Sequence, residues 1–106
     1  MVGDDDGMAV GAEQRRSPRA RIELECRLHR RTGSPIACHT VDVGPGGMCV
    51  CSERPLAQDE LLEFELPPRI SGRARVLRQQ GFDLYAIRFE ALAEPAREEL
   101  QRIAAA

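Results

Sequence analysis

The sequence predicts a mostly β domain, a small antiparallel barrel or sandwich of about six short strands followed by one α-helix. Two observations lead to the strands: short runs that alternate apolar and polar residues, and turn-forming residues at regular spacing between them. A third, the helical recurrence of apolar residues near the C-terminus, indicates the helix. The length of 106 residues allows a single domain, and the 42% hydrophobic content is typical of a folded chain.

Three strands are predicted in the first half of the chain. Residues 21 to 29 alternate strictly between apolar and polar side chains, which indicates a half-buried strand. After a turn at residues 30 to 35, the β-branched segment 36 to 43 predicts a second strand. Residues 44 to 47 (Gly-Pro-Gly-Gly) must turn, because such residues cannot hold a ladder, and residues 48 to 51 continue as a third strand. The predicted apolar face of the first strand comprises Ile22, Leu24, Cys26 and Leu28.

The second half predicts three more strands and the helix. Residues 60 to 66 alternate again, and residues 71 to 79 and 82 to 89 form a pair joined at Gln80-Gly81. Pro95 stands where an early helical position tolerates proline. We expect the helix to cap an opening or to cover a strand edge. Its apolar positions are Leu92, Ala96, Leu100 and Ile103.

Charge divides the chain into two parts. Residues 1 to 14 contain four acids and no cation, and we interpret them as a flexible acidic tail that precedes a domain at residues 15 to 106. Residues 15 to 31 carry seven arginines against two glutamates, and all 15 basic residues of the chain are arginines. The planar guanidinium group forms forked hydrogen bonds with phosphate and with guanine, which lysine cannot do.

The same composition excludes several classes of protein. No apolar run approaches the roughly 20 residues that a membrane helix needs. The acidic start does not resemble a signal peptide, so we expect a cytoplasmic protein with reduced cysteines. No nucleophile, base and acid are arranged for catalysis, and we expect no enzyme activity and no cofactor.

Two segments carry candidate binding chemistry. Arg15 and Arg19 precede the first strand, and Asp42, Gly44 and Gly47 bracket the turn between the second and third strands. An arginine fork can pair with the O6 and N7 atoms of guanine or with phosphate. A carboxylate can accept the N–H groups of guanine's other edge, and glycines allow close backbone approach. The residue types fit a guanine nucleotide, although taken alone such segments are more often a solvated loop and a simple turn.

The spacing Arg15-x-x-x-Arg19, followed by a strand and then Asp42-x-Gly44-x-x-Gly47, resembles the PilZ domain. That family carries an RxxxR motif and a (D/N)xSxxG motif and binds the bacterial second messenger cyclic di-GMP. The segment Tyr85-Ala86-Ile87-Arg88-Phe89 is also similar to the closing strand of the family. The resemblance covers nearly everything from Gln14 onward and implies a six-stranded antiparallel β-barrel with one C-terminal α-helix.

The resemblance also implies a role for each site residue. Arg15 and Arg19 would grip guanine and phosphate from an N-terminal segment that folds over the ligand and signals to a protein partner. Asp42 would bind a guanine edge, and Gly47 would allow close approach. Gly44 stands where the family has serine, so one hydroxyl contact is missing. This departure leaves open a degenerate adaptor that binds no nucleotide and acts through protein contacts.

Two further interpretations were weighed. The four cysteines and two histidines could supply metal ligands, but no CxxC pair exists and the candidates lie on predicted strands, so we expect no metal site. The second interpretation is a barrel that binds nucleic acid through its arginines. The chain has only four aromatic residues and no stacking motif next to the arginine cluster, so we do not expect nucleic acid as a partner.

Overall fold

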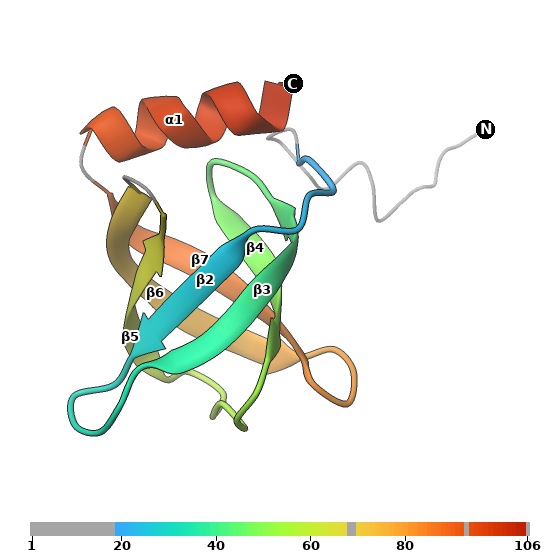
Figure 1. Cartoon of the computed structure of the whole chain (residues 1–106), viewed down its shortest axis with the longest axis vertical. Coiled ribbons are helices and arrows are strands. Elements are labelled where there is room, and N and C mark those ends of the chain that lie inside the picture. Colours follow the sequence, from blue (N-terminus) through green and yellow to red (C-terminus); the bar gives the residue numbers. More distant parts are fainter. Residues whose placement is uncertain (1–18, 68–69, 93, 106) are drawn as a thin grey trace.

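The computed structural model describes residues 19–67, 70–92 and 94–105. They form a closed barrel of six antiparallel strands with one helix across an end of the barrel (Figure 1). The predicted fold class is therefore confirmed, and the structure decides for a barrel over a sandwich. The elements are β2 (Glu25–His29), β3 (Ile36–Val43), β4 (Gly47–Ser52), β5 (Leu61–Leu66), β6 (Ile70–Gln79), β7 (Leu84–Leu92) and α1 (Glu94–Ala105).

The strands follow the spatial order β2-β3-β4-β7-β6-β5, and β2 pairs with β5 to close the ring. Leu28 of β2 stands opposite Phe64 of β5 at this seam. Both side chains are almost completely buried, so the seam is part of the core. Closure removes the unpaired strand edges that would otherwise invite association with another chain.

The core fills the barrel with one side chain in two along most strands, as the alternating sequence predicts. The rings of Phe64 and Phe89 stack with their centroids 4.7 Å apart, which joins β5 to β7 through the interior. The largest fully buried side chains are Phe64, Leu28, Ile36, Met48, Leu62, Leu66, Leu100, Val43, Val50 and Val76, with Thr40 and Cys26.

Helix α1 lies across one open end of the barrel and contacts β6 and β3 (Figure 1). Ala96, Leu100 and Ala104 are buried beneath it, spaced by four residues so that they share one face. Leu92, which the sequence pattern assigned to the helix, instead ends β7. The helical period predicts the buried face correctly from Ala96 onward. It does not indicate that β7 and α1 are joined by a connection as short as one residue.

The first predicted strand is shorter than expected, because its ladder begins only at Glu25. Before that point Thr40 N still donates to Leu24 O at 2.9 Å, but the Thr40 side chain supplies the other contacts: its Oγ1 accepts from Leu24 N at 2.8 Å and donates to Ile22 O at 2.6 Å. The chain leaves strand geometry there, and Ile22 is 37% exposed rather than in the core.

The last hairpin also differs from the prediction. We expected a strand from Phe82, but β7 begins at Leu84 and the Phe82 side chain is 96% exposed. Backbone bonds from Gln80 N and Gly81 N to Leu84 O, at 2.8 and 3.4 Å, close a loop that carries Phe82 at its tip. Phe82 fits the alternating pattern of a strand, but the hydrogen bonds to Leu84 O place it in the turn instead.

Truncation of Leu100 tests how strongly the helix is bound to the barrel. Leu100→Ala removes a fully buried side chain and should lower the free energy of unfolding by about 2–5 kcal/mol, measured by urea denaturation. Leu61→Ala is the matched control, because Leu61 is 45% exposed and its loss should cost less than about 1 kcal/mol. Equal losses in the two variants would contradict the packing role of α1.

A forked ion pair joins the end of β2 to the segment before β5. Arg30 Nε lies 2.5 Å from Glu60 Oε2, and Nη2 lies 3.2 Å from Oε1. Arg30 thereby lowers the pKa of Glu60 below its ordinary value of 4.5. Because the folded state holds the charged form, the contribution of Glu60 is present above pH 4.5 and is lost as the pH falls through the lowered pKa.

Glu60→Gln should therefore be less stable than the wild type at neutral pH. The difference in the free energy of unfolding should shrink as the pH falls below 4.5. Urea denaturation at a series of pH values measures it. Glu98→Gln is the control, since Glu98 is exposed on α1 and forms no ion pair within the described residues. A difference between Glu60→Gln and wild type that stays constant with pH would show that the ion pair does not contribute.

Candidate functional site

An irregularity in β3 determines where Asp42 points. Thr40 pairs with Val50 and Asp42 pairs with Cys49, so Val41 is an extra residue with no partner on β4. Thr40 faces the core, and strict alternation would also turn Asp42 inward. The bulge instead places Asp42 on the outer face and the fully buried Val43 in the core.

Arg19 reaches Asp42 because the chain before β2 is fixed to the same end of β3. Ala20 and Val43 exchange two backbone hydrogen bonds, at 2.8 and 2.9 Å. Their outward neighbours, Arg19 and Asp42, then meet side by side. Arg19 Nε donates to Asp42 Oδ1 at 3.0 Å, and Nη2 donates to the same oxygen. The two side chains are 25% and 19% exposed, so the pair is accessible to a ligand.

Both arginine bonds use one carboxylate oxygen. In the part of the chain that the structure describes, Asp42 Oδ2 has no hydrogen-bond partner. A carboxylate held in this way can accept N–H groups from a ligand while the cation beside it neutralises its charge. The arrangement suits a ligand that presents donors next to acceptors, as the edge of a guanine base does.

The turn after Asp42 consists of three glycines and a proline. Gly44 N donates to Gly47 O at 2.9 Å, and Phe89 N donates to Gly46 O at 2.9 Å, which anchors the turn to β7. A Cβ atom on Gly47 would lie 2.3 Å from the carbonyl oxygen of Ile87. Glycine is therefore required at position 47 by the close approach of β7.

Cys49 belongs to the site, although its sequence context indicated only a packed thiol. It stands opposite Asp42 in the ladder, and its Sγ lies 3.5 Å from Gln80 Oε1. Burial raises the pKa of the Cys49 thiol, and the Asp42 carboxylate raises it further, while Arg19 opposes them. The thiol thus stays protonated and uncharged beside the Arg19–Asp42 pair. The bulge in β3 places Cys49 opposite Asp42, which alternation alone does not predict.

The structure brings together Arg19, Asp42, Gly44 and Gly47 at one end of β3, whereas Arg15 lies outside the described residues. Arg88 stands opposite Gly47 and is 56% exposed, which adds a second cation near the turn that the motif did not indicate.

The cysteines are thiols within the barrel rather than metal ligands or disulfides in the described chain. Cys26 and Cys38 are buried cross-strand partners, and the four thiols are free. Among residues 19–67, 70–92 and 94–105, no three His, Cys, Asp or Glu side chains are grouped so that they could hold a metal ion. Within those ranges no helix is long and apolar enough to cross a membrane.

Comparisons with known proteins agree with the barrel fold. The family model described as PilZ domain matches residues 13–106. A solved structure, the Inhibitor of motility (MotI/DgrA) of Bacillus subtilis, superimposes with a TM-score of 0.72 at 15% sequence identity. The match covers 87% of this chain and 49% of that one, so the chain spans about half of the solved structure. A search of curated proteins finds no match.

The two adjacent glycines of the turn offer a matched pair of substitutions. Gly47→Ala places a methyl group against Ile87 O and should cost about 1–3 kcal/mol in the free energy of unfolding. Gly46→Ala should change it by less than about 1 kcal/mol, because nothing lies within 4 Å of an added Cβ. Urea denaturation measures both, and a Gly47→Ala protein as stable as Gly46→Ala would contradict the close approach.

Proposed function

The chain belongs to the PilZ domain family, and from that membership we propose that it is a receptor that binds cyclic di-GMP non-covalently. PilZ domains are receptor and adaptor domains, and we propose no catalytic activity. The single observation that carries the proposal is the Arg19–Asp42 pair, which stands on the outer face with Oδ2 open to a ligand. Arg15, Arg19, Asp42, Gly44 and Gly47 form the proposed site.

Asp42 and Arg19 supply complementary chemistry for guanine. Asp42 Oδ2 accepts the N–H groups of the guanine edge, while the Arg19 guanidinium turns toward O6 and N7 or toward a phosphate oxygen. Arg19 must give up part of its hydrogen bonding to Asp42 in order to bind the ligand. This exchange limits the net gain in binding free energy. The two phosphates of the ligand then need further cations, and the proposal assigns Arg15 to them.

Ligand binding would also act on the N-terminal segment. Arg15 lies four residues before Arg19, which the Ala20–Val43 bridge fixes to β3. A ligand gripped by both arginines would fix the segment between them over the site. We propose that a protein partner recognises this altered surface.

Gly44 supports a second candidate function. The family has serine at this position, and the missing hydroxyl removes one contact worth about 0.5–1.5 kcal/mol. The alternative is therefore a PilZ-like adaptor that binds no nucleotide and acts by protein–protein contacts. MotI/DgrA is named as an inhibitor of motility, but the match spans only half of it, and we propose no specific process from it.

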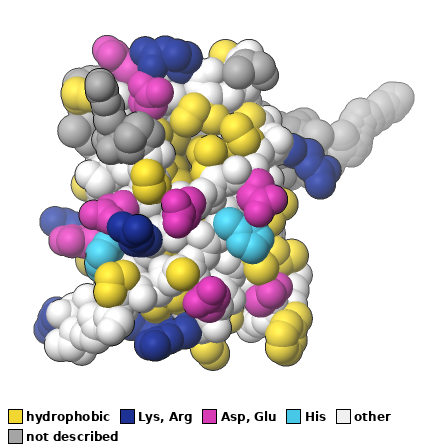
Figure 2. Space-filling view, viewed as in Figure 1, with side chains coloured by type: hydrophobic (Ala, Val, Ile, Leu, Met, Phe, Trp, Pro, Cys, Tyr) yellow, Lys and Arg dark blue, Asp and Glu magenta, His cyan; other side chains and the backbone are white. Residues whose placement is uncertain are grey.

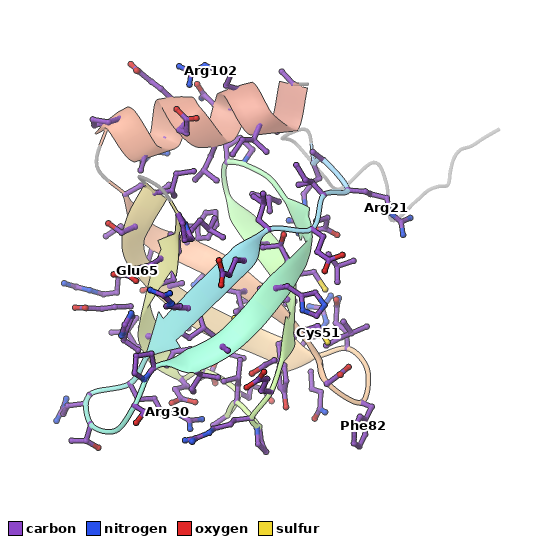
Figure 3. All side chains as sticks on the ribbon, in the orientation of Figure 1. Arg21, Arg30, Cys51, Glu65, Phe82 and Arg102 are labelled. Carbon is purple, nitrogen blue, oxygen red and sulfur yellow. The ribbon has the colours of Figure 1, made fainter. Side chains whose placement is uncertain are left out.

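Titration calorimetry with cyclic di-GMP separates the two functions. The wild type should bind saturably at tens of micromolar protein, and Arg19→Ala should bind at least about tenfold more weakly. Arg19→Lys should lose most of this affinity, because lysine keeps the charge without the fork. Arg21→Ala is the matched control, since Arg21 is exposed and points away from the barrel (Figure 3).

Three outcomes are informative. No saturable heat with the wild type would exclude the receptor and leave the adaptor. Equal binding by wild type and Arg19→Ala would place the ligand elsewhere. Gly44→Ser should tighten binding up to about tenfold by restoring a hydroxyl donor, and unchanged affinity would show that this contact is not needed.

A further inference from the structure

A second surface lies on the outer face of β2, β3 and β4, apart from the Arg19–Asp42 pair. It is a groove of about 560 Å³. The face over β2 and β3 in Figure 2 carries acidic side chains and histidine, with arginine beside them. We call the groove the acidic groove, and its lining includes Glu23, Glu25, His39, Cys51, Glu53 and Asp83.

The ladder explains why these residues converge. Glu25 stands opposite His39, and His39 stands opposite Cys51, so their side chains form one row across three strands. Cys51 Sγ donates to Asp83 Oδ2 at 3.1 Å, which extends the row to the β6–β7 loop. The centre of the groove therefore lies on three strands, while Glu23, Glu53 and Asp83 join it from the segments next to them.

The carboxylates of the acidic groove form no ion pair in the described chain, although Arg27 lies two residues from Glu25 on the same face of β2. Glu23, Glu25, Glu53 and Asp83 take part in no ion pair within those residues, whereas Asp42, Glu60 and Glu90 each pair with arginine. No arginine lines the groove, although the chain has 15. A concave surface with charges of one sign concentrates ligands of the opposite sign.

Phe82 adds an apolar anchor beside the groove. It precedes Asp83 and projects from the tip of the β6–β7 loop, away from the barrel (Figure 3). Its side chain is 96% exposed, yet its backbone is fixed, because Gln79 Nε2 donates to Phe82 O at 2.7 Å. Aromatic side chains presented in this way are typical of the residues that carry most of the energy of protein interfaces.

From these observations we propose that the acidic groove and Phe82 together dock a cationic segment of a partner protein. The segment carries arginine or lysine side chains for the carboxylates and an apolar side chain for Phe82. The inference rests on the proposed function, because the acidic groove and Phe82 would be the surface that the proposed protein partner recognises. It also connects that surface to the ligand site, because Cys49 neighbours Asp42 and contacts Gln80, two residues before Phe82.

A labelled synthetic peptide of alternating arginine and leucine is the probe, with fluorescence anisotropy as the measurement on the full chain. We expect saturable binding, and no binding of a peptide in which glutamate replaces arginine. Phe82→Ala and the double variant Glu25→Gln with Glu53→Gln should each weaken binding at least about fivefold. Glu98→Gln removes a carboxylate on α1, outside the groove, and should bind as the wild type does.

The experiment is run with and without cyclic di-GMP, so that a failed ligand titration leaves the peptide result interpretable. The proposal is overturned if the arginine peptide does not bind, if the glutamate peptide binds equally, or if the groove variants match Glu98→Gln. Sedimentation of the chain alone tests a second copy as occupant. A dimer that Phe82→Ala dissociates would replace the partner protein with a self-association surface.

Discussion

The extra residue in β3 is the constraint on which the proposed site depends. Without the bulge at Val41, Asp42 would share the inward face of Thr40, and a carboxylate would enter the core. An unpaired charge in an apolar interior is too costly to persist, so the strand must shift its register or lose the carboxylate. The bulge resolves this conflict, because it keeps Val43 in the core and leaves Asp42 beside Arg19.

Other features of the fold follow from the same stretch of β3. Thr40 is 1% exposed, and its hydroxyl takes the place of a ladder partner for the chain before β2. That chain returns to β3 only at Ala20, which brings Arg19 to the bulge. The close contact of Gly47 with β7 then holds the turn on the other side. The proposed binding surface is thus assembled from backbone contacts, which bring its two charged side chains together.

The sequence predicted the strands, the helix and the barrel well, because alternation and turn residues report directly on burial. It failed where a side chain replaced the backbone, as Thr40 does near Ile22, and where a turn outweighed an apolar residue, as at Phe82. The motif spacing predicted that Arg19 and Asp42 belong together. Alternation alone could not predict the bulge or the place of Cys49, since both depend on pairing between distant strands.

We propose that the nucleotide binds at the Arg19–Asp42 pair that the bulge holds in place. Amide chemical shifts measured by NMR during a titration with cyclic di-GMP test this proposal. We expect saturable shifts at Arg19, Asp42 and the turn from Gly44 to Gly47, with β5 unaffected. Saturable shifts that centre elsewhere on the barrel, or none at any of these residues, would contradict it.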